Sequence, residues 1–319
     1  MRIGLCVKGF TRILQILQDV LPDDDVFELG RAEVVRVARE VDILIPTVAP
    51  IPAEAFDGPR IKLVQQYGVG LDSVDIPAAT KAGVLVANIP SARTGNAESV
   101  AELAIAHMLM LSRHIPLALE RFNGKRVGSP LGNCIWESTV VILGFGGIGQ
   151  EVARRLAGFG VKIIVVSRDG PSGKRDRDSS IRIDKHVGAN DMNEVLEEAD
   201  YLIVAAPASP ENIGLVDESA LQRIKPGAYI VNIARGPVLH YQALLNALRD
   251  GRVAGAGIDV FWQEPFDPED PLLQFNVIPT PHIGGSTERS LAGIGRAVAA
   301  NIEMLRSGEL PSNCANPEA

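Results

Sequence analysis

Short apolar runs alternate with longer mixed segments in the first hundred residues. Segments with helical or turn character separate the apolar runs, which have the length and composition of buried strands. Because alternating strands and helices form βαβ units, this region predicts a parallel sheet. The predicted strands are "RIGLCV", "VDILIPTV", "IKLVQQYG" and "GVLVANIP", and the segments between them are "TRILQILQDVL", "AEVVRVARE" and "DIPAATKAG".

A second alternation begins at "TVVILGFGGIG" and predicts another parallel sheet from about residue 139 to residue 282. Residues 96–113 form a nearly all-round apolar pattern, which predicts a helix buried between domains or subunits. Another helix is predicted at 288–308, and the tail after it is expected to be frayed or extended. The fold class is therefore α/β, with two doubly wound parallel-sheet domains.

The composition supports this organisation and excludes several functions. A chain of 319 residues exceeds the size of roughly 250–300 residues at which single cores tend to divide. It has no apolar run near the roughly 20 residues of a membrane span, and it begins in a strand-like run, so we expect a cytoplasmic protein. A formal net charge of −8 offers no general attraction to nucleic acid. The three cysteines lack metal-ligand spacing, and no metal site is predicted.

A glycine motif follows the first strand of the second sheet. Gly144, Gly146 and Gly149 give G-x-G-x-x-G between a strand and a helix, which is typical of dinucleotide binding. The first glycine permits a tight turn, the second allows the pyrophosphate to approach, and the third allows close helix packing. The helix N-terminus directs N–H groups at the phosphates. Gly147 and Ile148, at the start of that helix, are predicted to contact the cofactor as well.

The end of the next apolar run lacks the acid of an NAD site. That acid binds the ribose 2′-hydroxyl about 20 residues after the glycines. Here Ser167 lies 18 residues after Gly149 (167 − 149), and Arg168 follows it. A serine removes the repulsion against a 2′-phosphate, and a guanidinium binds one well. NADP is therefore the predicted cofactor, with NAD as the alternative because Asp169 would serve as a displaced acid.

A nearby loop carries further positive charge. Lys174, Arg175 and Arg177 follow within ten residues of Ser167. They would add positive potential near a 2′-phosphate, but a solvated surface loop explains them more simply than direct contact.

Three segments at strand ends of the second sheet contribute residues with catalytic chemistry, namely Arg235, Glu264 and His282. Ligands bind at the carboxyl edge of a parallel sheet. Reducing a 2-keto acid requires a cation for the carboxylate, a proton donor for the carbonyl oxygen and a positioned hydride. Arg235 suits the carboxylate, His282 the proton transfer, and Glu264 would stabilise and orient the imidazolium.

Six motifs, in this order along nearly the whole chain, resemble the D-isomer-specific 2-hydroxyacid dehydrogenase family. The resemblance implies a flavodoxin-like substrate-binding domain from residues 1–97 and 289–319. It also implies a Rossmann NAD(P)-binding domain with linking helices at residues 98–288, and a homodimer. The motifs are "YGVGLDSVDI", "GNAESVAEL", "LGFGGIGQEVARRL", "VNIARG", "AGAGIDVF" and "NVIPTPHIGGST".

The resemblance also implies how the substrate is bound. Arg235 matches the arginine that binds the substrate's carboxylate and carbonyl, and His282 matches the acid/base, with Glu264 as its partner. Val69 and Gly70 match a loop whose backbone N–H groups receive the carboxylate. Asn96 matches a polar position beside the substrate.

The implied cofactor contacts lie in the second half of the chain. Asp259 matches the residue that hydrogen-bonds the nicotinamide amide, and Ile233 and Ala234 match residues that line the nicotinamide. Ala206 and Pro207 match a wall of the cofactor pocket. His282 would contact both cofactor and substrate.

Some positions depart from the family pattern. Gly147 replaces an Arg or Asn of many relatives, which removes a side-chain contact to the pyrophosphate. His240 and Tyr241 replace an acidic pair, and surface replacement is favoured over a substrate role. Arg93 and Thr94 lie in a longer, more polar loop that would face the cleft. Packing or surface roles are expected for His107, His114, His186 and Trp262.

These features predict an oxidoreductase that transfers a hydride between NADP(H) and a small 2-keto or 2-hydroxy acid, with glyoxylate and hydroxypyruvate as examples. An NAD-dependent D-2-hydroxyacid dehydrogenase is the nearest alternative. A cofactor-sensing, co-repressor-like binding protein is an alternative from another class. The intact Arg, Glu and His set favours an enzyme. No nucleic-acid or membrane partner is expected.

Overall fold

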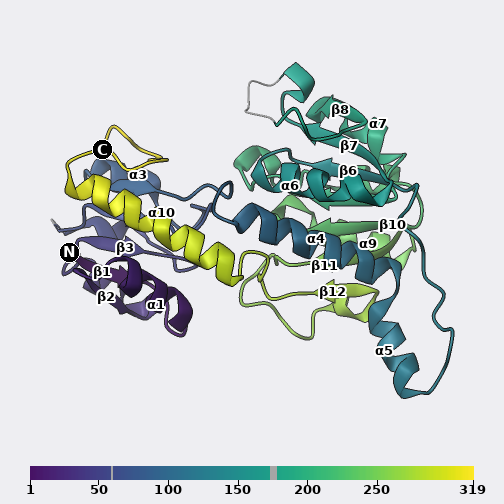
Figure 1. The fold of residues 1–319 in the computed structure, drawn as a ribbon, viewed down its shortest axis with the longest axis horizontal. Coiled ribbons are helices and arrows are strands. Elements are labelled where there is room, and N and C mark those ends of the chain that lie inside the picture. Colours follow the sequence, from purple (N-terminus) through teal and green to yellow (C-terminus); the bar gives the residue numbers. More distant parts are fainter. Residues whose placement is uncertain (59, 173–177) are drawn as a thin grey trace. The chain divides into compact units, whose positions relative to one another are not determined.

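The chain folds into two compact α/β units. The structure, a computed structural model, describes residues 1–58, 60–172 and 178–319. One unit contains Met1–Asn96 and Thr287–Ala319, and the other contains Ala97–Ser286 (Figure 1). The predicted boundaries at 97/98 and 288/289 lie close to these divisions. Lys174, Arg175 and Arg177 lie outside the described residues.

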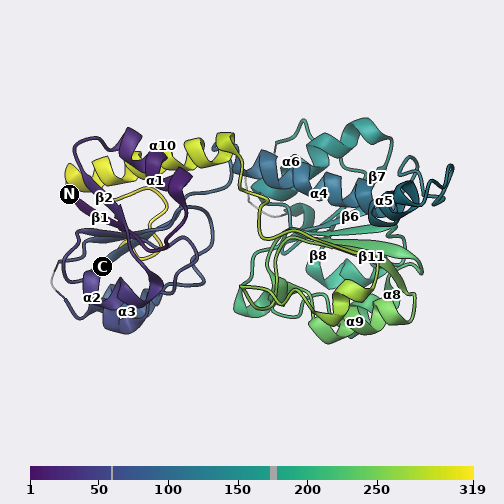
Figure 2. The same cartoon turned by 90° about the horizontal axis from the view of Figure 1, so that it is seen from below.

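The first unit is built on a parallel five-stranded sheet in the order β2-β1-β3-β4-β5. This is the flavodoxin-like strand order, 2-1-3-4-5. Helices α1 and α10 cover one face, and α2 and α3 cover the other (Figure 2). The elements are β1 (Arg2–Leu5), α1 (Thr11–Val20), β2 (Asp25–Glu28), α2 (Val34–Val37), β3 (Ile43–Ile45), β4 (Leu63–Gln65), α3 (Ile76–Lys81), β5 (Leu85–Ala87) and α10 (Glu288–Arg306).

Both faces of this sheet are apolar because successive side chains of a strand point to opposite sides. In β3, Ile43 and Ile45 pack into the core beneath α1 and α10, whereas Leu44 packs into the core beneath α2 and α3. All three are fully buried. The continuous apolar runs of the sequence are therefore the signature of a sheet covered by helices on both sides.

Two glycines lie within the last helix, α10, although glycine normally weakens a helix. A Cβ on Gly293 would lie 1.9 Å from the backbone oxygen of Thr94, and one on Gly295 would lie 2.4 Å from the side chain of Ile16 in α1. Close packing on both sides thus requires glycine here. The helix begins after Thr287, whose side chain accepts a hydrogen bond from the N–H of Ser290 (3.2 Å).

The C-terminal tail is docked, so of the two expectations, a frayed or an extended tail, the frayed one is wrong. The N–H of Ala315 donates to the backbone oxygen of Val86 in β5 (2.7 Å). The Asn316 side chain is 1% exposed, and its Oδ1 accepts from the Val86 N–H at 2.7 Å. Its Nδ2 donates to Val84 O and Thr80 Oγ1 at 2.9 Å each. The tail therefore pairs with an edge strand that would otherwise expose hydrogen-bonding groups.

The second unit is built on a parallel seven-stranded sheet in the order β12-β11-β10-β9-β6-β7-β8. Counted from β6, this is the Rossmann order 3-2-1-4-5-6 with one added strand. Figure 2 shows α4 and α6 on one face of the sheet and α8 and α9 on the other. The strands are β6 (Thr139–Leu143), β7 (Lys162–Ser167), β8 (Lys185–Gly188), β9 (Tyr201–Val204), β10 (Ala228–Asn232), β11 (Val253–Ile258) and β12 (Val277–Pro279), and the helices are α4 (Asn96–Ser112), α5 (Ile115–Asn123), α6 (Gly147–Leu156), α7 (Met192–Leu196), α8 (Glu218–Arg223) and α9 (Tyr241–Arg249).

The strand order of this sheet reverses between β6 and β9, which marks the position of a ligand site. In open α/β sheets, ligands bind outside the carboxyl ends of the strands at such a switch point. Gly144 follows β6 directly, and Ala206 follows β9. The predicted fold class, two doubly wound parallel-sheet domains, is confirmed.

Candidate active site

The glycine loop at the switch point has one glycine that the protein's own packing does not require. A Cβ on Gly144, where φ is +100°, would lie 2.6 Å from Ala206 N, and a Cβ on Gly149 would lie 2.1 Å from Gly144 O. A Cβ on Gly146 would meet nothing within 4 Å. Gly146 therefore leaves open space where α6 begins, which is what a loop that receives a pyrophosphate at a helix N-terminus requires.

Replacing Gly146 with alanine is expected to weaken NADPH binding about tenfold or more without reducing thermal stability, since the methyl group enters space that the ligand needs. Fluorescence titration and a thermal melt measure the two effects. Gly149→Ala is the matched contrast, because its methyl group overlaps the Gly144 oxygen and should lower the melting temperature. Unchanged NADPH affinity in Gly146→Ala would contradict the assignment.

Ser167 and Arg168 lie at the carboxyl end of β7, as predicted for the adenosine end of the cofactor. Ser167 Oγ lies 2.8 Å from the Nε2 atom of His186 on β8. Arg168 is exposed. The hydroxyl of Ser209 and a backbone N–H lower the pKa of Glu211, and the charge of Arg168 adds to this effect. The positive charge of Arg168 therefore acts on Glu211, which lies in the loop after β9.

The turn that carries Arg235 is held by a buried amide. Asn232 ends β10 and is fully buried. Its Oδ1 accepts from the N–H of Ala234 (3.1 Å), and its Nδ2 donates to the carbonyl of Arg235 (3.0 Å). Ile233 and Ala234, predicted to line the nicotinamide, are both buried. The Asn232 contacts therefore fix the backbone from which the Arg235 side chain extends.

His282 and Glu264 form a direct pair. The Nδ1 atom of His282 lies 2.9 Å from Oε2 and 3.1 Å from Oε1 of Glu264. Oε1 also accepts from the N–H of Phe261 at 3.1 Å, which holds the carboxylate in place. Because Nδ1 faces the carboxylate, Nε2 is the ring nitrogen that can meet a substrate.

The environment of Glu264 keeps its carboxylate charged. Burial would raise the pKa of Glu264. The hydrogen bond and positive charge of His282, the Phe261 N–H and the charge of Arg235 together outweigh it, so the pKa lies below its ordinary 4.5. The charges of His282 and Arg235 therefore both act on the carboxylate of Glu264.

Asp259 organises the loop that carries His282. Its carboxylate is buried and accepts from Thr280 Oγ1 (2.6 Å) and from the N–H groups of Ile283 and Gly284 (2.9 Å each). The N–H of His282 donates to the carbonyl of Asp259 (2.9 Å). These contacts hold His282 at a φ of 55°, in the left-handed region. The contact of Asp259 with a nicotinamide amide stays a prediction.

The packing role predicted for His107 is confirmed. This residue of α4 is fully buried, and its Nε2 lies 3.1 Å from Thr280 Oγ1. Because Thr280 donates its hydrogen to Asp259, the hydroxyl accepts from His107, which is therefore protonated on Nε2. Burial lowers the pKa of His107 and keeps the ring neutral. Through Thr280, His107 thus helps to hold the loop that carries His282.

The predicted substrate loop lies in the first unit. Asn88 Nδ2 donates to the carbonyl of Val69 (2.6 Å), and the side-chain amide of Gln66 donates to the carbonyl of Gly70. Asn96 Nδ2 donates to Ser290 Oγ in α10 (3.2 Å). These three predicted substrate residues therefore belong to a different unit from Arg235, Glu264 and His282, and their contact with a shared substrate stays a prediction.

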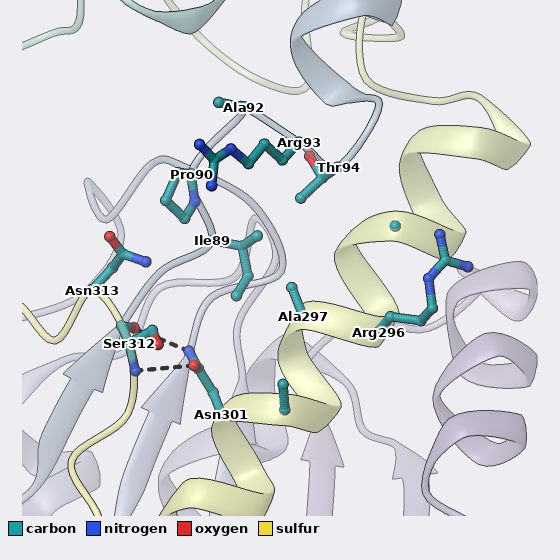
Figure 3. Close-up of a pocket in the computed structure, with 12 residues that line it drawn as sticks. Ile89, Pro90, Ala92, Arg93, Thr94, Arg296, Ala297, Asn301, Ser312 and Asn313 are labelled. Carbon is teal, nitrogen blue, oxygen red and sulfur yellow. Dashed lines mark hydrogen bonds between the residues drawn. The ribbon is translucent and has the colours of Figure 1, made fainter. Parts of the chain in front are cut away.

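Arg93 and Thr94 line a pocket of about 420 Å³ in the first unit. The pocket lies between the loop that carries them, α10 and residues 312–313 (Figure 3). Arg296 of α10 also borders it, but the two guanidinium groups point in different directions (Figure 3). The pocket therefore does not gather positive charge around one ligand position.

His240 and Tyr241 make structural contacts, which supports surface replacement over a substrate role for these two residues. Nδ1 of His240 accepts from the N–H of Ala243 (3.3 Å) and so caps α9. The Tyr241 hydroxyl donates to Asp270 (2.9 Å), and its ring packs edge-on against Trp262 at 5.0 Å between centroids. By contrast, the expectation that His186 has only a packing or surface role overlooked its contact with Ser167.

Within the part of the chain that the structure describes, no group of three or more His, Cys, Asp or Glu side chains could hold a metal ion. In that same part, no helix combines the length and apolar character needed to cross a membrane.

Comparison with known proteins gives concordant matches. Residues 105–284 match the family model "D-isomer specific 2-hydroxyacid dehydrogenase, NAD binding domain". The chain is 36% identical to a glyoxylate reductase of Thermococcus onnurineus, across 92% of this chain and 89% of that one. It is 35% identical to the Pyrococcus furiosus glyoxylate reductase, across 91% and 87%.

A solved structure also matches. An NADPH-dependent glyoxylate/hydroxypyruvate reductase of Sinorhizobium meliloti, in complex with NADP and malonate, superimposes with a TM-score of 0.83. It is 28% identical, and the match covers 99% of this chain and 97% of that one.

The fold and these matches identify a nicotinamide-dependent dehydrogenase that acts on CH–OH groups. The chain belongs to the D-isomer-specific 2-hydroxyacid dehydrogenase family. Its substrates are accordingly small 2-hydroxy or 2-keto acids.

Proposed function

We propose that this protein is an NADPH-preferring reductase of glyoxylate, hydroxypyruvate and similar small 2-keto acids. The observation that carries the catalytic part is the contact of His282 Nδ1 with Glu264 at 2.9 Å, in electrostatic reach of Arg235. Glyoxylate reductases are among the relatives, which supports the substrate class. The S. meliloti relative is NADPH-dependent, which supports the cofactor.

Arg235, His282 and Glu264 have different tasks in the proposed reaction. Bound NADPH supplies a hydride for C2 of the keto acid. Arg235 binds the carboxylate and the carbonyl oxygen through its planar guanidinium and stabilises the negative charge that develops there. His282 donates the proton on Nε2 to that oxygen. Glu264 fixes the ring orientation and stabilises the imidazolium until the proton leaves.

The cofactor is proposed to bind along the carboxyl ends of β6, β7 and β9. The open space at Gly146 and the N-terminus of α6 would receive the pyrophosphate, with Ile148 and Gly147 as part of the same surface. Ala206 and Pro207 would form a wall of the pocket, and Ile233 and Ala234 would line the nicotinamide. Ser167 and Arg168 would receive the 2′-phosphate.

The two units are proposed to divide these tasks. The flavodoxin-like unit would contribute Val69, Gly70 and Asn96 to the substrate site, and the Rossmann-like unit would bind the cofactor.

A homodimer is also proposed. Exposed apolar side chains on α5 and the segment after it support an interface there: Leu119 is 62% exposed and Phe122 is 79% exposed. Sedimentation velocity at micromolar concentration tests this assembly, and a monomer would contradict it.

Absorbance assays with NADPH and NADH against a panel of 2-keto acids test the proposal. Turnover of glyoxylate or hydroxypyruvate is expected, with a higher kcat/KM for NADPH than for NADH. A higher value for NADH would refute the cofactor preference. Cofactor binding without turnover of any acid would favour the cofactor-sensing alternative.

Glu264→Gln is expected to lower kcat for reduction by about tenfold, the usual difference between a hydrogen bond to a charged group and one to a neutral group. The Glu264 carboxylate is charged, since its pKa lies below its ordinary value, and it contacts His282 Nδ1 at 2.9 Å. A neutral amide keeps a contact with the ring but removes the negative charge beside it. Initial rates at saturating NADPH measure the loss, and an unchanged kcat would rule out the electrostatic role of Glu264.

A further inference from the structure

A histidine on β8 lies beside the predicted 2′-phosphate position. In the parallel pairing of β7 and β8, His186 aligns with Val165, and Gly188 aligns with Ser167. The His186 ring also packs against Phe145 with its centroid at 5.8 Å and an interplanar angle of 60°. Phe145 lies between Gly144 and Gly146 and is almost fully buried. His186 therefore connects the glycine loop to the end of β7.

The contact between His186 and Ser167 decides what the serine can offer to a ligand. A serine hydroxyl has one hydrogen to donate and lone pairs that accept. If Ser167 donated to Nε2 of His186, only lone pairs would face outward, and these repel a phosphate. If the Nε2–H of His186 donates instead, the serine hydrogen stays available. The carbonyl of Gly170 lies 3.4 Å from Ser167 Oγ and competes only weakly for that hydrogen.

We propose that His186 is a positioning residue for NADP recognition: its Nε2–H donates to Ser167 Oγ, and Ser167 then donates its hydrogen to the 2′-phosphate beside Arg168. This inference rests on the proposed NADP preference and adds a residue to it. The 2.8 Å contact sets the direction of the hydroxyl, and the packing of Phe145 keeps the ring in place. Recognition of the phosphate thus depends on a side chain that does not itself touch the ligand.

Calorimetric binding of 2′,5′-ADP and 5′-AMP tests the role independently of turnover, because the two ligands differ only in the 2′-phosphate. His186→Leu should weaken 2′,5′-ADP binding about tenfold, which is typical for the loss of a hydrogen bond to a charged group, and leave 5′-AMP binding unchanged. His186→Gln retains an N–H donor and should restore most of the affinity. Combining His186→Leu with Ser167→Ala should add little to Ser167→Ala alone.

The outcomes separate this inference from the proposal beneath it. If the unsubstituted protein binds 5′-AMP as tightly as 2′,5′-ADP, the NADP preference fails, and the role of His186 fails with it. If the protein prefers 2′,5′-ADP but His186→Leu binds it equally well, only the inference on His186 is overturned. Equal losses for both ligands, or additive effects in the double variant, would show that His186 acts through packing and would also overturn it.

Discussion

Replacement of His282 by glutamine is expected to lower kcat for glyoxylate reduction by about 10²–10⁴-fold, the usual contribution of a positioned general acid. Glutamine can hydrogen-bond to Glu264 but cannot supply a proton near neutral pH. NADPH affinity should change little, because the glycine loop and the Ser167 region, at other strand ends, are proposed to make most of the cofactor contacts. Initial rates at saturating substrates and a fluorescence titration measure the two quantities.

His240→Asn is the matched control for this change. His240 caps α9 through Nδ1, and asparagine is a good N-cap residue, so the fold and activity should be retained. If His282→Gln retained turnover similar to that of the control, proton donation by His282 would be refuted.

Replacing Arg235 with lysine is expected to reduce kcat/KM for glyoxylate by about 10²–10³-fold, a range typical for the loss of a preorganised charge-stabilising donor. Lysine keeps the positive charge but loses the planar fork that binds a carboxylate at two points. The backbone of residue 235 is held by Asn232 and should not move. The loss should therefore appear in kcat and in the KM for the keto acid rather than in NADPH affinity.

Arg249→Lys, an exposed change on α9, is the control for Arg235→Lys and should have no effect on steady-state kinetics. An altered NADPH affinity in Arg235→Lys with an unchanged KM for the keto acid would contradict the assignment, because it would place Arg235 at the cofactor instead.

The sequence predicted the strands whose apolar runs are long and buried on both faces, but it missed β2 and β8. Both are short edge strands, and both contain charged residues, such as Asp25 and Lys185. These charged residues interrupt the apolar runs, so the hydrophobic pattern of the two strands is weak. Since β8 was not recognised, nothing in the sequence placed His186 beside Ser167, which lies 19 residues earlier.

Candidate catalytic residues could be named because parallel strands end at one edge, so that Arg235, Glu264 and His282 were expected to gather there. The residues that hold these side chains in position could not be named from the sequence. Asn232 and Thr280 act through contacts between a strand end and the following loop, and these contacts depend on the geometry of the turns.

The docking of Asn316 against β5 was likewise absent from the local pattern, because a tail of polar residues gains order only from the edge it covers. The cytoplasmic location, the homodimer and the preference for NADP stay predictions.

Transfer of deuterium from the cofactor to the product tests the central claim most directly. The protein is incubated with hydroxypyruvate and NADPH that carries deuterium at C4 of the nicotinamide, in either of its two configurations. Hydride transfer at this site predicts D-glycerate with deuterium at C2 from only one of the two cofactors. Bound cofactor with no labelled product, or labelled L-glycerate, would contradict it.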